Sequence, residues 1–389
     1  MNILFIAPFC PYPLDQGGKI RVFNLIKYLS RNHRITLACL SFDTAPDCGP
    51  LVDFCDEVIV IERPESFAWD FARFLLGGET FNCRRFASQS FAGALSELAA
   101  RKSFDLVQIE FSMLWQYARY FPGLPVYLDA HNIEYRNVQQ IGNEAKNPVK
   151  RLLYRLETKR LKALEEQSWR ECALCFAVSD NERDDISAHS KQAVTASNGV
   201  DPDRFVFRNR EKSGKKILFL GGMDYSPNLD AARFFLCNIF PLIRRKEPEA
   251  QVLLVGRELG KLGSEASLPG VECHESVAEV LPWFYEADLL AVPLRQGAGT
   301  RIKVLEAMAA GLPVVTTSKG CEGIAVENGL ELLIADTAEE FAAAVLQILT
   351  APDKGRGLAQ CARRLVEKQY TWESAAKHTD DQYHRILGR

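Results

Sequence analysis

The stretch from residue 297 to residue 308 reads Gly-Ala-Gly-Thr-Arg-Ile-Lys-Val-Leu-Glu-Ala-Met and predicts a glycine-rich loop that opens a helix. An apolar segment at residues 289–294 precedes it as a strand, and Gly311-Leu312-Pro313 ends the helix. This order is typical of a parallel sheet, whose ligands bind at the carboxyl ends of the strands. Free N–H groups at an exposed helix start, the helix dipole and the cations Arg301 and Lys303 therefore predict a cradle for a diphosphate.

Known phosphate-binding fingerprints differ from this loop. A dinucleotide-binding G-x-G-x-x-G would need a third glycine where Ile302 stands, and the chain has no G-x-x-x-x-G-K-[ST]. The loop therefore disfavours a dehydrogenase and a P-loop NTPase. Glu306 lies deeper in the same helix, where a carboxylate can accept hydrogen bonds from ribose hydroxyls.

Both halves of the chain alternate short apolar runs with longer helical patterns. Between Gly18 and Arg31, for example, apolar residues recur at i, i+3, i+4 and i+7, which predicts one face of a helix. Two successive series of this kind predict the α/β class, with two doubly wound, Rossmann-like domains. The expected strands are residues 3–7, 35–40, 58–61, 106–109, 126–128 and 174–178, then 217–220, 252–255, 289–292, 314–316 and 332–334.

Polar turn signals mark the boundary between the two domains. Residues 198–215 contain Asn-Gly, Asp-Pro and the charged stretch 208–212 between two apolar runs. We therefore expect an N-terminal domain over residues 1–197 and a second domain that begins at residue 198. Two such sheets leave a cleft where their carboxyl ends face each other, and ligands bind in such clefts.

Length and composition fit two globular domains. The chain has 389 residues, of which 47% are hydrophobic and 25% charged. The net charge of -3 disfavours nucleic acid as a partner. No apolar run is long enough to predict a membrane-spanning helix. Residues 1–9 lack the basic start of a signal peptide and predict a buried strand, so we expect a cytoplasmic protein.

The cysteines and acidic pairs give little sign of a metal site. Eleven cysteines are scattered along the chain, mostly in apolar surroundings, which predicts reduced core thiols. Cys172 and Cys175 form a C-x-x-C within a predicted strand, but no second pair follows at zinc-site spacing. Asp201-Pro202-Asp203 matches a D-x-D metal motif, yet its place beside Asn198-Gly199 favours a turn. We expect no metal.

The N-terminal half contains a candidate anion site. Residues 13–21, Pro-Leu-Asp-Gln-Gly-Gly-Lys-Ile-Arg, form a loop that opens a helix after the first strand. Gly17 and Gly18 permit close approach to the backbone, and Lys19 and Arg21 oppose the helix dipole. This pattern indicates an anion, with a flexible turn and solvated cations as the alternative.

His131 is a second candidate in this half. Residues 128–134, Leu-Asp-Ala-His-Asn-Ile-Glu, close an apolar strand with polar groups at its carboxyl end. A lone histidine is more often structural than catalytic. Its position at the strand end nevertheless favours a functional role.

These residues together resemble the retaining family-4 glycosyltransferases of the GT-B fold, over nearly the whole chain. The general style is closest to sugar transferases of bacterial exopolysaccharide assembly. The run at residues 305–315, Leu-Glu-Ala-Met-Ala-Ala-Gly-Leu-Pro-Val-Val, is the most specific match. The other matching pieces are Gly17-Gly18-x-x-Arg21, the strand end at His131, Ala177-Val178-Ser179, Asn198-Gly199-Val200-Asp201, Val255-Gly256 and Ala287-Asp288.

The resemblance implies an architecture and an activity. Two Rossmann-like domains would face a central cleft, residues 1–197 binding the acceptor and residues 198–371 the donor, while a helix over 372–389 would pack back on the first domain. A sugar would pass, with retention, from a UDP- or GDP-type nucleotide-diphosphate sugar to a hydroxyl acceptor, such as a lipid-linked saccharide. No metal or further cofactor is implied. A nucleotide-sugar epimerase of the same architecture and a catalytically silent sugar-nucleotide-binding partner are the alternatives.

The motifs and the resemblance together assign roles to individual residues. Catalytic residues would be His131, Arg301, Lys303 and Glu306; donor-binding residues would be Gly222, Ser276, Val277, Gly297, Ala298, Gly299, Thr300, Arg301 and Glu306; acceptor- or phosphate-binding residues would be Gly17, Gly18, Lys19 and Arg21.

Three positions depart from the family's pattern. Ala298 stands where most members carry a first glutamate, eight residues before Glu306. Residues 221–228 lack the usual arginine and lysine, and Glu275 replaces a glycine before the base-binding turn. We expect the cations of the 297–308 stretch to supply the missing charge from the other side of the donor site.

One predicted helix of the first domain is strongly basic and amphipathic. Such a helix can rest on an anionic membrane surface, here the inner face of the cytoplasmic membrane, and a solvated face is the alternative. Glu157 is the one acid within the basic span. Its cations are Lys146, Lys150, Arg151, Arg155, Lys159, Arg160 and Lys162, and its apolar stripe is Leu152, Leu153, Leu156, Leu161 and Leu164.

Overall fold

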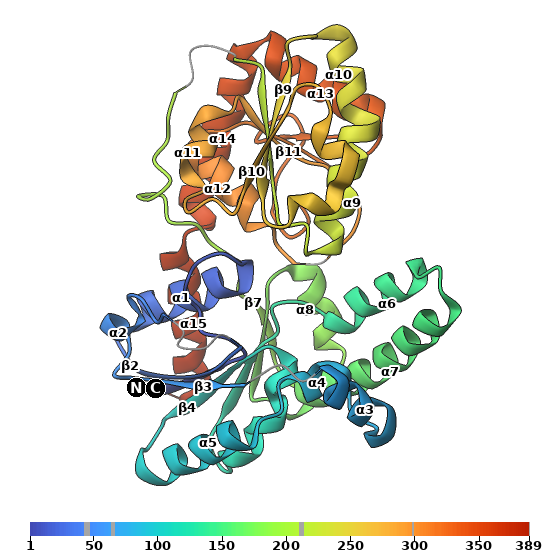
Figure 1. The fold of residues 1–389 in the computed structure, drawn as a ribbon. Coiled ribbons are helices and arrows are strands. Elements are labelled where there is room, and N and C mark those ends of the chain that lie inside the picture. The colour runs from blue at the N-terminus through green and yellow to red at the C-terminus, as the bar shows by residue number, and fades with distance from the viewer. Residues whose placement is uncertain (43–46, 64–66, 210–213, 298, 389) are drawn as a thin grey trace. The chain divides into compact units, whose positions relative to one another are not determined.

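The computed structural model describes residues 1–388 except 43–46, 64–66, 210–213 and 298 (Figure 1). Ala298, one of the predicted donor-binding residues, therefore lies outside the described residues. The chain divides into two compact units. Unit 1 consists of Met1–Ser197 and Ala375–Arg389, and unit 2 of Asn198–Ser374.

Unit 1 is built on a parallel sheet, seven-stranded over the residues described, with the order β3-β2-β1-β4-β5-β6-β7. In β1, Ile3 and Phe5 pack on one face of the sheet and Leu4 and Ile6 on the other. Because both faces are buried, the strands are continuous apolar runs in the sequence. The strands are β1 Asn2–Ala7, β2 Arg34–Ser41, β3 Glu57–Glu62, β4 Leu106–Glu110, β5 Val126–Asp129, β6 Leu174–Ala177 and β7 Ala193–Thr195.

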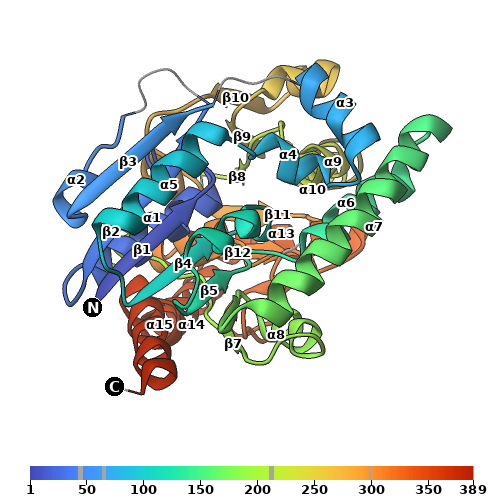
Figure 2. The same ribbon diagram turned by 90° about the horizontal axis from the view of Figure 1, so that it is seen from below.

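Helices cover both faces of this sheet (Figures 1 and 2). On one face α1 packs with the C-terminal helix α15, whose Ala376 and Tyr383 are buried in the same core. On the other face α5 and the 3-10 helix η1 pack through residues such as Phe91 and Leu114. The helices of unit 1 are α1 Gly17–Leu29, α2 Leu51–Phe54, α3 Phe67–Gly77, α4 Phe81–Arg85, α5 Gln89–Arg101, η1 Ser112–Tyr120, α6 Glu134–Glu144, α7 Pro148–Glu171, α8 Asp180–Ser187 and α15 Trp372–Leu387.

Unit 2 repeats the design on a second parallel sheet with the order β10-β9-β8-β11-β12-β13. The strands are β8 Lys216–Leu220, β9 Gln251–Gly256, β10 Val271–Glu275, β11 Leu289–Val292, β12 Val314–Thr316 and β13 Leu333–Ile334. The helices are α9 Ser226–Phe234, the π-helix η2 Phe235–Ile239, α10 Phe240–Lys246, the 3-10 helix η3 Leu259–Ser267, α11 Leu281–Glu286, α12 Ile302–Ala310, α13 Ala338–Thr350 and α14 Pro352–Gln369.

The strands expected from the sequence are present, and two further strands lie at sheet edges. These are β7 and β10, which end the two strand orders. β7 has three residues, and β10 reads Val-Glu-Cys-His-Glu with mostly exposed side chains. Edge strands are half solvated and short, so they lack the apolar run that marks a buried strand. Cys172 and Cys175 are buried thiols as expected, whereas Cys237 is exposed.

The helix that follows the glycine loop at residues 297–300 ends as predicted at Gly311. α12 follows the glycine loop, and nearly all its side chains are buried. Gly311 adopts a left-handed conformation with φ 78°, and the amide of Leu312 donates to the carbonyl of Ala307. Glycine tolerates this conformation without strain, so the helix stops there and Pro313 leads into β12.

A close approach of two strand ends in unit 2 generates a prediction about stability. A Cβ added to Gly256 would lie 2.0 Å from the carbonyl oxygen of Gly221, while a Cβ on Gly357 in α14 would meet no atom within 4 Å. Gly256→Ala should therefore lower the free energy of unfolding by about 1–3 kcal/mol, because β8 and β9 must separate. Gly357→Ala, the matched control, should raise it by up to about 1 kcal/mol. Denaturant unfolding of both variants checks this, and equal stability of the two contradicts it.

Candidate active site

The carboxyl edge of the unit 1 sheet brings three ionisable side chains together. Glu110 ends β4, Asp129 ends β5, and His131 follows two residues later. His131 Nε2 lies 2.7 Å from Glu110 Oε2. One side-chain nitrogen or oxygen atom from each of the three residues lies within 4.8 Å of the other two. All three side chains are buried. Neighbouring parallel strands end at the same edge, which is how residues distant in sequence meet here.

Burial changes the acidity of Glu110. Its removal from water, together with the charge of Asp129, raises the pKa of Glu110 above its usual value, while hydrogen bonds from His131 and Gln108 oppose the shift. Glu110 therefore holds a proton more readily than a solvated glutamate does.

The backbone around His131 is held in an unusual conformation. Phe111 has φ 70° and His131 has φ 58°, both in the left-handed region that side chains other than glycine seldom adopt. Their rings are stacked with centroids 3.8 Å apart and planes inclined by 12°. Such backbone strain gathers at functional sites because only a well-packed surrounding maintains it.

Gly18 completes this packing at the start of α1. A Cβ on Gly18 would lie 3.0 Å from Phe111 Cζ and 3.1 Å from Phe9 Cζ. The rings of Phe9 and Phe111 meet edge to face, with centroids 5.7 Å apart. The start of α1 thus packs closely on the aromatic ring that stacks on His131, which joins two sites that the sequence treats separately.

Arg21 is not at the surface, where an anion ligand would lie. Its side chain is 1% exposed, and Nε donates to Asp129 Oδ2 at 2.8 Å. A buried guanidinium requires a partner, because removing its charge from water costs on the order of several kcal/mol. The alternative of a solvated cation is therefore wrong for Arg21, and the residue joins α1 to the end of β5.

The other residues of this loop remain available to solvent. Gly17 begins α1, and Gln16 occupies the N-cap position before it. Among the described residues, the Gln16 side chain makes no capping hydrogen bond to the helix amides. Lys19 is only partly buried and forms an ion pair with Asp15, with Nζ and Oδ1 3.0 Å apart. Binding of an acceptor or phosphate by Gly17, Gly18 and Lys19 stays a prediction.

In unit 2, Lys303 lies where the sequence did not lead us to expect it. It is partly buried rather than exposed, and its Nζ donates to Leu220 O at 2.7 Å and to Asn228 Oδ1 at 3.3 Å. Burial, together with the charge of Arg301, lowers the pKa of Lys303 to about 7. The side chain therefore reaches from α12 to the end of β8 and to α9, on either side of the loop whose residues 221–228 lack the family's usual cations.

Glu306 is buried one turn further along α12. Burial raises its pKa to about 7, and the charge of Arg204 opposes the shift. Two groups on one helix, Lys303 and Glu306, thus have pKa values close to neutrality. Paired groups with perturbed pKa values are typical of functional sites.

The glycine loop before α12 is shaped by close contacts. Gly297 and Gly299 have φ values of 98° and 80°. A Cβ on Gly297 would lie 2.9 Å from a terminal guanidinium nitrogen of Arg301 and 3.0 Å from the hydroxyl of Tyr225. Thr300 is buried, and its carbonyl accepts from Asn198 Nδ2 at 3.4 Å. Arg301 therefore lies back over the loop that leads into its own helix.

Arg257 is a cation at this edge that the sequence analysis missed. It follows β9 and pairs with Asp224, with the two charged atoms 3.1 Å apart. A Cβ on Gly222 would lie 3.6 Å from its guanidinium. Ser276, exposed with φ 53°, donates its amide to Gly256 O at 2.9 Å, and Val277 packs against the core. Gly222, Ser276 and Arg257 thus belong to adjacent strand ends.

Two family models match the chain, one after the other. The model described as Glycosyltransferase Family 4 matches residues 16–204, and the model described as Glycosyl transferases group 1 matches residues 214–351. The chain belongs to this glycosyltransferase family. The resemblance that the sequence analysis identified is confirmed.

Relatives and solved structures agree with this assignment. A 44.6 kDa protein in the cps region of Klebsiella pneumoniae is 21% identical over 88% of this chain and 89% of that protein. Phosphatidyl-myo-inositol mannosyltransferase of Mycobacterium tuberculosis is 27% identical over 55% of this chain and 60% of the enzyme. Sucrose-phosphate synthase from Thermosynechococcus elongatus has a TM-score of 0.75 at 15% identity, covering 100% of both chains. Anabaena HepE, solved with UDP-glucose, has a TM-score of 0.71 at 14% identity, covering 99% of this chain and 100% of that one. The predicted GT-B fold is confirmed.

This glycosyltransferase has a hollow of about 450 Å³ at the carboxyl edge of the unit 2 sheet. The hollow follows the ends of β11, β12 and β13, and its volume is in the range of small-molecule sites. No glycine-rich signal accompanies these strand ends in the sequence, so the residues that line the hollow were not predicted. The lining residues are Leu294, Arg295, Thr317, Ser318, Lys319, Glu322 and Asp336.

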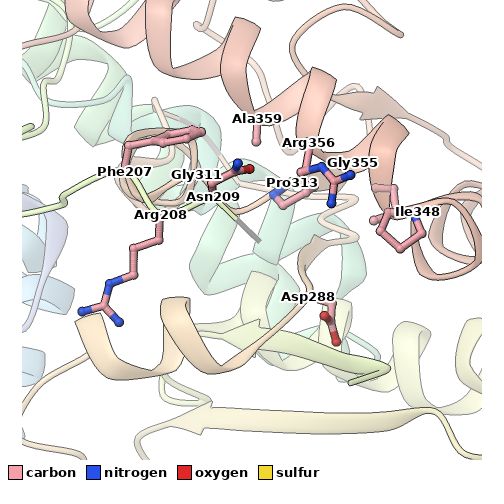
Figure 3. A pocket seen from close by; sticks show the side chains of 11 residues that line it. Phe207, Arg208, Asn209, Asp288, Gly311, Pro313, Ile348, Gly355, Arg356 and Ala359 are labelled. Atoms are coloured by element: carbon pink, nitrogen blue, oxygen red, sulfur yellow. The ribbon is translucent and has the colours of Figure 1, made fainter. Parts of the chain in front are cut away.

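A second hollow lies at the opposite, amino edge of the same sheet (Figure 3). Asp288 and Pro313, which line it, directly precede β11 and β12. Its volume of about 20 Å³ has room for about one water molecule. It is therefore too small for a nucleotide sugar.

The predicted basic helix is α7, and Lys146 lies just before it (Figures 1 and 2). Leu161 is buried, whereas Leu152 is 66% exposed, so only part of the expected apolar stripe packs on unit 1. Glu157 is buried and accepts from the amides of Phe81 and Asn82, at 2.8 and 3.2 Å. Glu157, the one acid of the basic span, is therefore absent from the exposed surface of the helix. The exposed cations are Lys146, Lys150, Arg151, Arg155, Lys159 and Lys162.

Among the described residues, no helix is both long and apolar enough to cross a lipid bilayer.

The buried Glu306 generates a prediction about pH and stability. Its pKa is about 7 in the folded chain and 4.5 when unfolded, so the unfolded chain loses its proton first as the pH rises. The contribution of a protonated Glu306 to stability is therefore complete below pH 4.5 and lost as the pH rises to about 7. Glu306→Gln should be more stable than the parent at pH 8, by about 3 kcal/mol. Denaturant unfolding of the parent and of Glu306→Gln at pH 4.5 and pH 8 tests this. A stability difference between the two proteins that is the same at both pH values contradicts it.

Proposed function

We propose that this glycosyltransferase moves a hexosyl group, with retention, from a UDP- or GDP-type nucleotide sugar to a hydroxyl acceptor in polysaccharide or glycoconjugate synthesis. The observation that carries the proposal is the start of α12, where Arg301 and Lys303 follow a glycine loop at the carboxyl edge of a parallel sheet. Unit 2 then binds the donor, and unit 1 binds the acceptor. The cps-region relative, the mannosyltransferase and the structure solved with UDP-glucose support this substrate class.

The chemistry follows from where charge develops. As the glycosidic bond of the donor breaks, negative charge grows on the leaving diphosphate and positive charge on the sugar ring. Amides of a helix start and fixed cations stabilise the diphosphate without reorganising. A bound diphosphate raises the pKa of Lys303 from about 7, so the lysine is charged when the leaving group needs it.

The remaining site residues take supporting roles in this scheme. Glu306 accepts hydrogen bonds from the ribose hydroxyls, and Gly222, Ser276 and Arg257 border the nucleotide. In unit 1, His131 orients a sugar hydroxyl through its imidazole. No residue of the mechanism requires a metal ion, because Arg301, Lys303 and Arg257 supply positive charge. Asp129 of unit 1 is already paired with Arg21.

The two alternatives predict different products. An epimerase returns the nucleotide sugar with one inverted centre and needs acid and base carboxylates near the sugar, whereas Ala298 replaces a glutamate. A silent binding partner binds the donor without turning it over. The protein is incubated with UDP- and GDP-hexoses and candidate acceptors, and the products are analysed by mass and anomeric configuration. This experiment distinguishes sugar transfer, epimerisation and binding without turnover.

The cations of α12 generate a prediction about turnover. Arg301→Ala and Lys303→Met should each lower the transfer rate by roughly 10–1000-fold, because each removes one contact to the leaving diphosphate. The methionine keeps the apolar stem that crosses to the end of β8, so folding should survive. Lys261→Met, in η3 on the same unit, is the control and should turn over like the parent. Parent rates in both test variants would refute the diphosphate assignment.

We further propose that α7 and its flanking segment rest on an anionic membrane surface where a lipid-linked acceptor is reached. Val149 and Leu152 are 64% and 66% exposed on the same helix as the exposed cations. Exposed apolar side chains among cations are typical of interfacial helices. The mannosyltransferase relative is named for a phosphatidyl-inositol acceptor, which fits such a location.

This surface generates a test with vesicles. Changing Lys150, Arg151 and Arg155 together to Glu should abolish sedimentation with vesicles that contain anionic lipid, because each cation contributes about 1 kcal/mol near the headgroups. The control changes Arg245, Lys246 and Lys368 of unit 2 to Glu, which alters net charge equally and should leave sedimentation intact. Equal recovery of the parent with neutral and anionic vesicles would refute the proposal.

A further inference from the structure

A line of buried polar side chains lies behind the Glu110–His131 pair. Gln108 precedes Glu110 by two residues on β4, so both side chains lie on one face of the strand. Gln108 Nε2 donates to Glu110 Oε1 at 2.6 Å, and the hydroxyl of Tyr383 in α15 donates to Gln108 Oε1. These bonds run continuously from the C-terminal helix to His131. Each of the four side chains is more than nine-tenths buried.

The direction of each hydrogen bond is set by the one before it. An amide has one oxygen that accepts and one nitrogen that donates. The hydroxyl of Tyr383 donates to the oxygen of Gln108, and the amide nitrogen of Gln108 faces Glu110. A donor at that position stabilises the ionised form of the carboxyl group. The amide in the opposite orientation would present its oxygen and favour the protonated form.

The charge on Glu110 in turn selects the tautomer of His131. An ionised carboxylate only accepts, so Nε2 of His131 carries the hydrogen that it receives. Nδ1 is then left with its electron pair, as the nitrogen able to accept a hydrogen bond from a sugar hydroxyl. A protonated Glu110 would reverse this, because it would donate to Nε2 and place the hydrogen on Nδ1.

We propose that Tyr383 and Gln108 are positioning residues that fix the tautomer of His131 through Glu110. The inference rests on the proposed function in one respect only, that His131 contacts the sugar. The C-terminal helix is thereby part of the active site although it touches no substrate.

Two further polar groups, Asp129 and Tyr127, lie beside the hydrogen-bonded line from Tyr383 to His131. Asp129 faces Glu110, where its charge contributes to the raised pKa of Glu110, and it forms an ion pair with Arg21. The ring of Tyr127 stacks on that of Tyr383, with centroids 5.3 Å apart. No described residue accepts or donates a hydrogen bond to the buried hydroxyl of Tyr127.

Tyr127 therefore offers a matched control. Tyr383→Phe and Tyr127→Phe each remove one buried hydroxyl from the same aromatic stack, but only the first breaks the line. Both variants should fold, because the rings and their packing are kept. Thermal unfolding of both establishes this before any comparison.

The tautomer is measured directly and without substrate. In protein labelled with ¹⁵N-histidine, ring nitrogen shifts distinguish protonated Nε2 from protonated Nδ1, and His131→Ala assigns the signal. The parent and Tyr127→Phe should show hydrogen on Nε2 at pH 7.5, whereas Tyr383→Phe should show a mixture. Identical spectra of the two phenylalanine variants would overturn the inference, even if the chain proves to transfer no sugar.

Kinetics supply the second measurement. Tyr383→Phe should lower kcat by about 2- to 10-fold with KM for the donor unchanged, because one hydrogen bond is lost. The acid limb of the kcat–pH profile should move upward by about half a unit, because Glu110 becomes more basic. Neither change should occur in Tyr127→Phe. In a His131→Ala background Tyr383→Phe should have no further effect, and an undiminished effect there would contradict the inference.

Discussion

The ion pair between Arg21 and Asp129 is the constraint on which the rest of the unit 1 site depends. Its two charges are almost fully removed from water, and each is tolerable only because the other is 2.8 Å away. The pair fixes the first turns of α1 against the end of β5. Gly18 is thereby held against Phe111, and Phe111 is held against His131. A strained backbone at His131 persists because these neighbours permit no relaxation.

Unit 2 uses burial for a different purpose. Lys303 and Glu306 on α12 both have pKa values of about 7, so each is close to the balance between its two charge states at neutral pH. Burial disfavours the charged form of each group. In the function that we propose, the charge of Lys303 is completed when a diphosphate binds. The same arrangement makes the proposed donor site sensitive to pH in a way that exposed cations would not be.

The sequence was sufficient to predict the repeated βα pattern and to place His131 after the end of a strand, because each rests on local signals: apolar runs and the polar residues that follow them. It was insufficient where the deciding contact is distant. Arg21 was expected to bind an anion or to be solvated, since nothing near it in sequence indicates Asp129, 108 residues away. Lys303 was expected at an exposed helix start, and its hydrogen bonds go to Leu220 and Asn228, 83 and 75 residues away. Glu110 and Arg257 follow apolar strands whose pattern explains them as ordinary strand ends.

Tyr383 shows why such a site is a property of the whole chain. It lies 275 residues from Gln108, and unit 2 is inserted between the two parts of unit 1. Residues 1–197 alone contain His131, Glu110 and Gln108 but lack the hydroxyl that donates to the amide of Gln108. The tautomer that we propose for His131 therefore depends on α15, which returns to unit 1 only after the whole of unit 2 in the chain.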